Sequence, residues 1–202
     1  MFVKICGLRT REHVDAAIAA GADAIGFVFA ESVRRIDPAA AAGITNMVPA
    51  DVRKVAVMLH PSNDEWRQVL AGFAPDVLQT DANDFAALDV PASIECWPVY
   101  REGNKVADPF RSIKKGSATF LYEGAKSGRG ETVDWSRAAR IAERGHMILA
   151  GGLGPDNVAE AIRTVRPWGV DVSSGVESAP GQKDPGLIQE FISAARAAET
   201  EL

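Results

Sequence analysis

Residues 2–29 read FVKICGLRTREHVDAAIAAGADAIGFVF, and this stretch contains a complete strand–helix–strand pattern. The run FVKI is short and apolar, as in a strand, and residues 9–20 then repeat apolar side chains at helical spacing. Gly21 ends that helix, and DAIGFVF at 23–29 is a second apolar run. Strands buried on both faces have such continuous apolar runs, so the pattern indicates two parallel strands joined by a helix.

The same alternation continues to the end of the chain. Further strands are expected at 52–59, 76–79, 93–100, 118–122, 146–150 and 169–173. Further helices are expected after the cap Asp37-Pro38, after Ser62 or Asn63, and over 135–144, 157–165 and 185–198. Eight strands with seven crossovers and a terminal helix predict one (β/α)8 TIM barrel, an α/β fold, spanning residues 1–202. An open doubly wound sheet is the alternative, but no GxGxxG follows the first strand.

Composition excludes several function classes. The net charge of −5 gives no electrostatic support to nucleic-acid or membrane-surface binding. The two cysteines, Cys6 and Cys96, are far apart in sequence, which favours a reducing compartment without a disulfide framework. The three histidines have no ligand spacing, so we expect no metal site. No apolar run has bilayer-spanning length, and we expect a cytoplasmic protein.

Two residues at predicted strand ends are candidates for acid–base chemistry. Cys6 ends the first strand, and parallel barrels carry their active sites where the strands end. A thiolate is a good base and nucleophile, although a free cysteine is more commonly a small buried hydrophobe. Glu123 follows Phe-Leu-Tyr, and it is either a solvated glutamate or a general acid whose pKa an apolar setting raises. The glycine-rich segment 124–131 after it is expected to form a mobile lid.

Two turns after the seventh and eighth strands are rich in small residues. AGGLGPDN at 150–157 contains Gly151 and Gly152, and VDVSSGVE at 170–177 contains Ser173, Ser174 and Gly175. Each alone could be an ordinary tight turn. Together they predict a phosphate site, because small residues let backbone N–H groups approach an anion and barrels commonly bind phosphate at these two loops.

A cationic pair lies in the loop after the second strand. One member of Arg34-Arg35 could form a two-pronged clamp on a ligand carboxylate, although a loop arginine is most often a solvated surface charge.

Blocks along the whole chain resemble phosphoribosylanthranilate isomerase, a (β/α)8 barrel of tryptophan biosynthesis. They are KICGLR (4–9), GADAIGFVF (21–29), SVRRID (32–37), GETVDW (130–135), AGGLGPDNV (150–158) and DVSSGVESAPGQKD (171–184). The resemblance implies an Amadori rearrangement, in which an acid opens the furanose ring of N-(5'-phosphoribosyl)anthranilate and a base removes the C2 proton. It implies no cofactor, because the iminium is the electron sink, and a small-molecule substrate as the ligand.

The resemblance also implies roles for individual residues. Cys6 matches the family's base, and Arg34 matches its anthranilate-binding arginine. Gln79 matches a substrate contact, and Asp171 lies on the sugar side. The phosphate contacts fall on the backbone around the two small-residue turns.

Two positions depart from the family's pattern. Glu123 stands where the family has its catalytic aspartate, and Asp81 stands in the substrate region where the family has a histidine. These departures leave a catalytically silent ligand-binding barrel as one alternative to this isomerase. A related phosphosugar isomerase is the other, because many such barrels bind phosphate. Either a monomer or a homodimer is compatible with the sequence.

Overall fold

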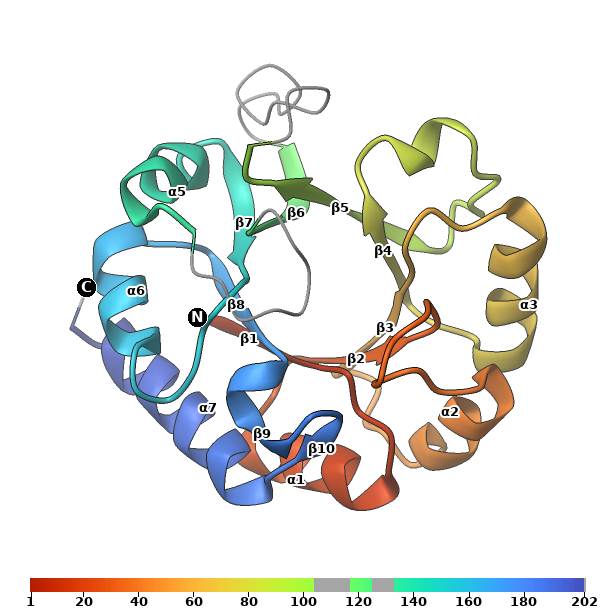
Figure 1. Ribbon diagram of the computed structural model, residues 1–202, viewed down its shortest axis with the longest axis horizontal. Helices are drawn as coiled ribbons and strands as arrows, with labels where there is room; N and C mark the ends of the chain where they lie inside the picture. Colours follow the sequence, from red (N-terminus) through yellow and green to blue (C-terminus); the bar gives the residue numbers. More distant parts are fainter. Residues whose placement is uncertain (104–116, 125–132, 202) are drawn as a thin grey trace.

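The computed structural model describes residues 1–103, 117–124 and 133–201. Eight parallel strands close into a barrel in chain order, with β8 pairing with β1, and helices surround the ring (Figure 1). The strands are β1 (Phe2–Cys6), β2 (Ala24–Val28), β3 (Arg53–Val57), β4 (Val77–Asp81), β5 (Glu95–Arg101), β6 (Ser117–Glu123), β7 (Gly145–Leu149) and β8 (Gly169–Val172). The predicted (β/α)8 barrel is confirmed.

The outer helices begin within two residues of the predicted positions. They are α1 (Arg11–Ala20), α2 (Pro38–Thr45), α3 (Asn63–Phe73), α5 (Trp135–Ala142), α6 (Val158–Val165) and α7 (Pro185–Glu199). The Asp37 side chain accepts hydrogen bonds from the first turn of α2, and Ser62 forms a reciprocal capping box with Glu65 at the start of α3.

The crossover between β4 and β5 differs from the prediction. It contains the short 3-10 helix η1 (Asp84–Ala86) in place of an α-helix. The segment ends in Val90-Pro91, and the residue before a proline is biased away from helical backbone. The crossover between β5 and β6 falls mostly on residues 104–116, outside the described residues.

The barrel interior is a compact apolar cluster. It consists of Ala24, Val55, Val77, Trp97, Val99, Leu121, Ile148 and Ala150. Alternate strand residues point to opposite faces, so a larger second cluster packs between the barrel and its helices. Lys4 also points into the barrel and is fully buried.

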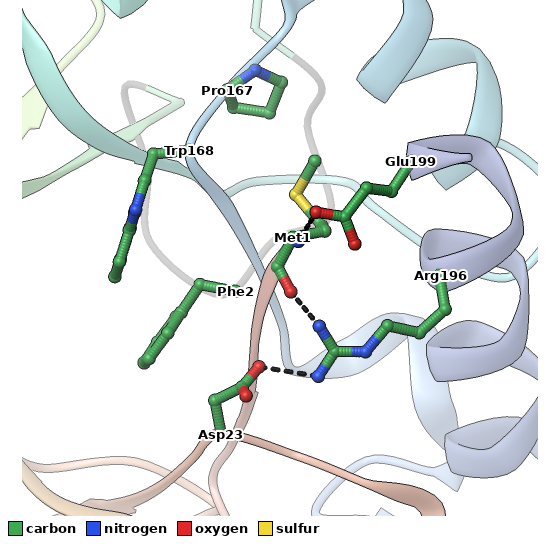
Figure 2. A pocket seen from close by; sticks show the side chains of 7 residues that line it. All are labelled: Met1, Phe2, Asp23, Pro167, Trp168, Arg196 and Glu199. Carbon is green, nitrogen blue, oxygen red and sulfur yellow. Dashed lines mark hydrogen bonds and ion pairs between the residues drawn. The ribbon is translucent and has the colours of Figure 1, made fainter. Parts of the chain in front are cut away.

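The amino ends of the strands carry no part of the predicted site. There Phe2 stacks on Trp168, with 4.6 Å between ring centroids. Arg196 from α7 donates hydrogen bonds to the Met1 carbonyl and to Asp23, and Figure 2 shows these groups around a groove of about 650 Å³. At this face of a barrel, such interactions serve stability.

After β8 the chain forms a short hairpin, an element that is not among those predicted from the sequence. The 3-10 helix η2 (Ser174–Val176) leads into β9 (Glu177–Ala179), which pairs with β10 (Gln182–Lys183). The hairpin places Glu177 and Lys183 beside the carboxyl end of the barrel, where both contact residues of the site.

Candidate active site

One cavity of about 260 Å³ opens at the carboxyl ends of the strands. Six predicted site residues from five separate chain segments line it: Cys6, Arg34, Gln79, Glu123, Asp171 and Ser173. Barrel closure therefore brings together a thiol, two carboxyl groups and a guanidinium that are distant in sequence. Asp81 lies beside this cavity, bound to the lining residue Arg101.

Cys6 is the last residue of β1 and is 6% exposed. It lies opposite Gly26 of β2 in the barrel ladder. Burial raises the pKa of the Cys6 thiol above its ordinary value, while the nearby Lys4 and Lys183 ammonium groups act against that rise. Burial disfavours the thiolate and the two ammonium groups favour it, so ionisation of Cys6 depends on these cations. A thiolate formed in this way can act as a base.

Glu123 ends β6, and its direct neighbour on β5 is Arg101. The Arg101 guanidinium forms an ion pair with the Glu123 carboxylate through Nη1. Glu123 is therefore neither a solvated glutamate nor in an apolar setting, the two environments that the sequence left open, because it is paired with a cation. The preceding residue, Tyr122, points to the opposite face of β6, where its hydroxyl group reaches Glu102. The aromatic ring of Tyr122 is therefore not the neighbour of the Glu123 carboxylate, which instead contacts Arg101 on β5.

Arg101 also binds Asp81, the residue at the family's histidine position. Nε donates to both Asp81 oxygens at 3.0 and 3.1 Å, and Nη2 donates to Oδ1 at 2.6 Å. His60 Nε2 lies 3.9 Å from Asp81 Oδ2, and its Nδ1 lies 2.9 Å from Asp84 Oδ1. The hydrogen bond with Asp84 raises the pKa of His60. Arg101 thus links the carboxylates of β4 and β6.

Arg34 is held at the cavity wall by the hairpin after β8. Nε and Nη2 donate to the two Glu177 oxygens at 2.7 and 2.8 Å. Lys183 Nζ binds the same Glu177 carboxylate at 2.6 Å and the Ser173 carbonyl at 2.9 Å. One fork of the guanidinium is thereby occupied, and the fork formed by Nη1 and the second Nη2 hydrogen has the geometry to take another carboxylate.

Asp171 and Gln79 form part of the cavity floor. Asp171 accepts a hydrogen bond at 2.8 Å from Lys4, its direct neighbour on β1. Gln79 is 5% exposed, and among the described residues its Oε1 atom has no hydrogen-bond partner. A buried amide oxygen without a partner is costly, so this atom is suited to accept a hydrogen bond from a ligand.

The two small-residue turns lie against each other. Gly151 and Gly152 have φ values of +93° and +64°, which glycine adopts without strain. A Cβ on Gly175 would lie 2.0 Å from the Leu153 carbonyl oxygen, so the turn after β8 packs directly on the turn after β7. Ser174 is the first residue of η2 in the same turn. The two turns that carry the predicted phosphate residues are therefore in direct contact, and of these residues Ser173 is the one that lines the cavity.

The sequence analysis assigns no role to four charged residues of this site: Lys4, Arg101, Glu177 and Lys183. Arg101 stands at a strand end and Lys4 precedes Cys6 by two residues, so strand position alone could have indicated both. The lid predicted at 124–131 lies outside the described residues except for Gly124.

Within the described residues, no group of three or more His, Cys, Asp or Glu side chains is arranged to hold a metal ion. None of the helices formed by the described residues has the length and apolar composition that a membrane-spanning helix requires.

The closed parallel barrel, with acid, base and cationic side chains at its carboxyl end, defines the class of (β/α)8-barrel enzymes. Residues 3–194 match the family described as PRAI, N-(5'phosphoribosyl)anthranilate (PRA) isomerase. The chain belongs to this family.

Individual relatives agree with that assignment. The chain is 45% identical to N-(5'-phosphoribosyl)anthranilate isomerase of Chromohalobacter salexigens, with 95% of this chain and 92% of the relative covered. It is 42% identical to the enzyme of the same name from Roseiflexus sp., with 97% and 98% covered. Among solved structures, phosphoribosyl anthranilate isomerase from Thermotoga maritima has a TM-score of 0.83 at 31% identity, with 98% and 99% covered. Another, in complex with reduced 1-(o-carboxyphenylamino)-1-deoxyribulose 5-phosphate, has a TM-score of 0.80 at 31% identity, with 98% and 99% covered.

Proposed function

We propose that this chain catalyses the isomerisation of N-(5'-phosphoribosyl)anthranilate to 1-(2-carboxyphenylamino)-1-deoxyribulose 5-phosphate in tryptophan biosynthesis. The observation that carries the proposal is the shared cavity of Cys6, Glu123 and Arg34 in a chain of this family. The reaction converts an aldose into a ketose within one molecule, so it needs an acid, a base and binding groups for a small anionic substrate.

Glu123 is the proposed acid. It donates a proton to the furanose ring oxygen, so that the C1–O bond breaks and the anilino nitrogen forms a C1=N iminium bond. Arg101 keeps its contacts with Asp81 when the Glu123 carboxyl group turns to the substrate, because the two carboxylates bind different edges of the guanidinium. In this ion pair Glu123 is a carboxylate, so before it acts as the acid it must leave Arg101 and take up a proton from the solvent that enters the cavity.

Cys6 is the proposed base. Its thiolate removes the proton from C2, and the electron pair flows into the iminium to give an enolamine, which then tautomerises to the ketone. The thiolate is formed in a buried site from which the bound substrate excludes water, and this favours proton transfer over side reactions of the iminium.

The remaining predicted residues are proposed to bind the substrate. The free fork of Arg34 takes the anthranilate carboxylate, and the Gln79 Oε1 atom accepts a hydrogen bond from a sugar hydroxyl. Asp171 lies on the sugar side of the floor, and Asp81 fixes Arg101. The backbone of the turns containing Gly151-Gly152 and Ser173-Ser174-Gly175 receives the phosphate.

Loss of phosphoribosylanthranilate fluorescence on addition of the purified protein tests the function. We expect turnover by the wild type and a loss of at least about 100-fold in kcat for Cys6→Ser, the usual scale of general-base catalysis. The matched control is Cys96→Ser, since Cys96 lies on β5 and is not among the cavity-lining residues. A wild type without turnover rejects the function, and equal rates in the two variants reject Cys6 as the base.

A further inference from the structure

Lys4 is a fully buried lysine to which the reaction scheme assigns no task. It lies on β1 two residues before Cys6, so both side chains point into the barrel. Its Nζ atom donates a 2.8 Å hydrogen bond to Asp171 on the neighbouring β8. Burying an ammonium–carboxylate pair is costly, and apolar residues at the same place would stabilise a barrel core at least as well. The pair therefore calls for an explanation beyond packing.

Gly26 reveals how close Lys4 comes to Cys6. A Cβ atom at this β2 position would lie 3.0 Å from Cys6 Sγ and 3.2 Å from Lys4 Nζ. The thiol and the ammonium group thus both lie against the position where a side chain of residue 26 would begin. They can do so because residue 26 is a glycine. Asp171 is the other neighbour of that ammonium group, and all three groups are buried.

We propose that Lys4 is a positioning residue that acts through Cys6: its ammonium group stabilises the Cys6 thiolate, and Asp171 limits this effect by sharing the same cation. In the isomerisation on which this role rests, the C2 proton moves to Sγ and leaves its electron pair in the enolamine. Lys4 exchanges no proton in that step. Its positive charge stays next to the sulfur before and after the transfer.

The other charges around Cys6 leave this role to Lys4. Burial raises the pKa of the thiol, the Lys4 charge is the largest influence that lowers it, and Asp171 raises it again. Lys183 on β10 also lowers it, but this ammonium group is bound to Glu177 at 2.6 Å. Arg34 beside the cavity is bound to Glu177 as well. Across the cavity, Arg101 and Glu123 are bound to each other.

Lys4 itself remains charged in this environment. Burial lowers its pKa, but the charges of Asp171 and Cys6 outweigh that effect, so the pKa of Lys4 is raised overall. The ammonium group is therefore favoured in its charged form beside the thiol.

Titration of Cys6 tests the proposal without substrate. In a Cys96→Ser background Cys6 is the sole cysteine, and its ionisation is followed by thiolate absorbance and by the rate of alkylation by iodoacetamide across pH. We expect Lys4→Met to raise the midpoint by about one pH unit or more, which slows alkylation about tenfold below the midpoint. Lys4→Arg should restore part of the shift. Asp171→Asn should move the midpoint in the opposite direction, because the ammonium group then has no competing anion.

An unchanged midpoint in Lys4→Met, or shifts of the same sign in Lys4→Met and Asp171→Asn, would overturn the proposal. If Lys4→Met does not fold, the double variant Lys4→Met/Asp171→Asn removes both buried charges, and its midpoint must lie above that of Asp171→Asn alone. In turnover assays, Lys4→Met should lower kcat more than it changes KM. In the pH profile of kcat/KM, the limb that rises with pH should shift to higher pH. A shifted titration in a protein without turnover rejects the isomerase function alone, whereas an unshifted titration in an active enzyme rejects the role of Lys4 alone.

Discussion

Arg34 donates two parallel hydrogen bonds to Glu177, at 2.7 Å from Nε and 2.8 Å from Nη2, across 143 residues of sequence. Both side chains are largely buried, at 11% and 4% exposure. The contact ties the loop after β2 to the hairpin after β8. It holds the Arg34 guanidinium at the cavity, so we expect Glu177 to contribute to stability and, under the proposed function, to substrate binding.

The first prediction concerns the pH dependence of stability. Burial raises the pKa of Glu177, but hydrogen bonds from Arg34 and Lys183 outweigh it and lower this pKa from 4.5 to about 2. Because the native pKa is the lower one, the stabilisation is complete above the unfolded pKa of 4.5 and is lost as the pH falls towards 2. We expect Glu177→Gln to reduce the free energy of unfolding at pH 7 by roughly 1–3 kcal/mol.

Urea unfolding of wild type and Glu177→Gln over a pH series provides the measurement. The difference between the two proteins should shrink once the pH falls below 4.5. A difference that stays constant down to the lowest pH would show that the charge of Glu177 does not stabilise the fold. Glu190→Gln is the control for the loss of one carboxylate, since Glu190 lies exposed on α7.

The second prediction separates the two carboxylates that share Arg101. Glu123→Gln should lower kcat by about 100-fold or more because the ring oxygen loses its proton donor, and Glu123→Asp should retain much of the rate. Asp81→Asn should have a smaller effect, since Asp81 acts through Arg101. Steady-state kinetics decides between them. Full activity in Glu123→Gln with none in Asp81→Asn would transfer the acid role to Asp81.

The third prediction uses the space beside Cys6. Gly26→Ala places a methyl group 3.0 Å from Cys6 Sγ and 3.2 Å from Lys4 Nζ, so both groups must shift. We expect kcat to fall at least about tenfold, because small displacements of a catalytic group are costly. The control is Gly43→Ala in α2, where a Cβ has no neighbour within 4 Å and should raise stability by about 0.4–1 kcal/mol. Unchanged kcat in Gly26→Ala would contradict the tight packing of this space.

The fourth prediction concerns the two turns after β7 and β8 that are proposed to bind the phosphate. In Gly175→Ala the new Cβ would lie 2.0 Å from the Leu153 carbonyl oxygen, so the two turns must separate. We expect weaker competitive inhibition by inorganic phosphate and a higher KM. The carboxylate end of the substrate should be bound as before, so inhibition by anthranilate should not change. Equal weakening by both inhibitors would indicate general damage to the barrel mouth.

The fifth prediction tests the opposite end of the barrel. Arg196→Met removes hydrogen bonds to the Met1 and Gly21 carbonyls and to Asp23. We expect a loss of about 1–3 kcal/mol in the free energy of unfolding with unchanged kcat and KM. Denaturant unfolding and steady-state kinetics on the same preparation measure both quantities. A changed kcat in a fully folded variant would show that this end influences the site.

Much of the site could be predicted because a parallel barrel collects the ends of its strands. Cys6 and Glu123 were predicted from their strand positions, and both line the cavity. The environment of each could not be predicted in the same way. For Glu123 the flanking aromatic residues suggested an apolar setting, but the residue that faces it, Arg101, belongs to the next strand. Neighbours across strands depend on register, and local patterns do not specify register.

The sequence by itself determined the alternation of strands and helices, the caps of α2 and α3, and the residue types at the strand ends. These features depend on local periodicity and short-range hydrogen bonds, which a few consecutive residues are enough to specify. Only the tertiary structure decided which charges meet: Lys4 binds Asp171 across 167 residues, and Glu177 binds Arg34 across 143. Barrel closure places β1 beside β8, and it brings the loop after β2 to the hairpin that follows β8. A buried charge without a partner is strongly unfavourable, so the charges that meet there form ion pairs.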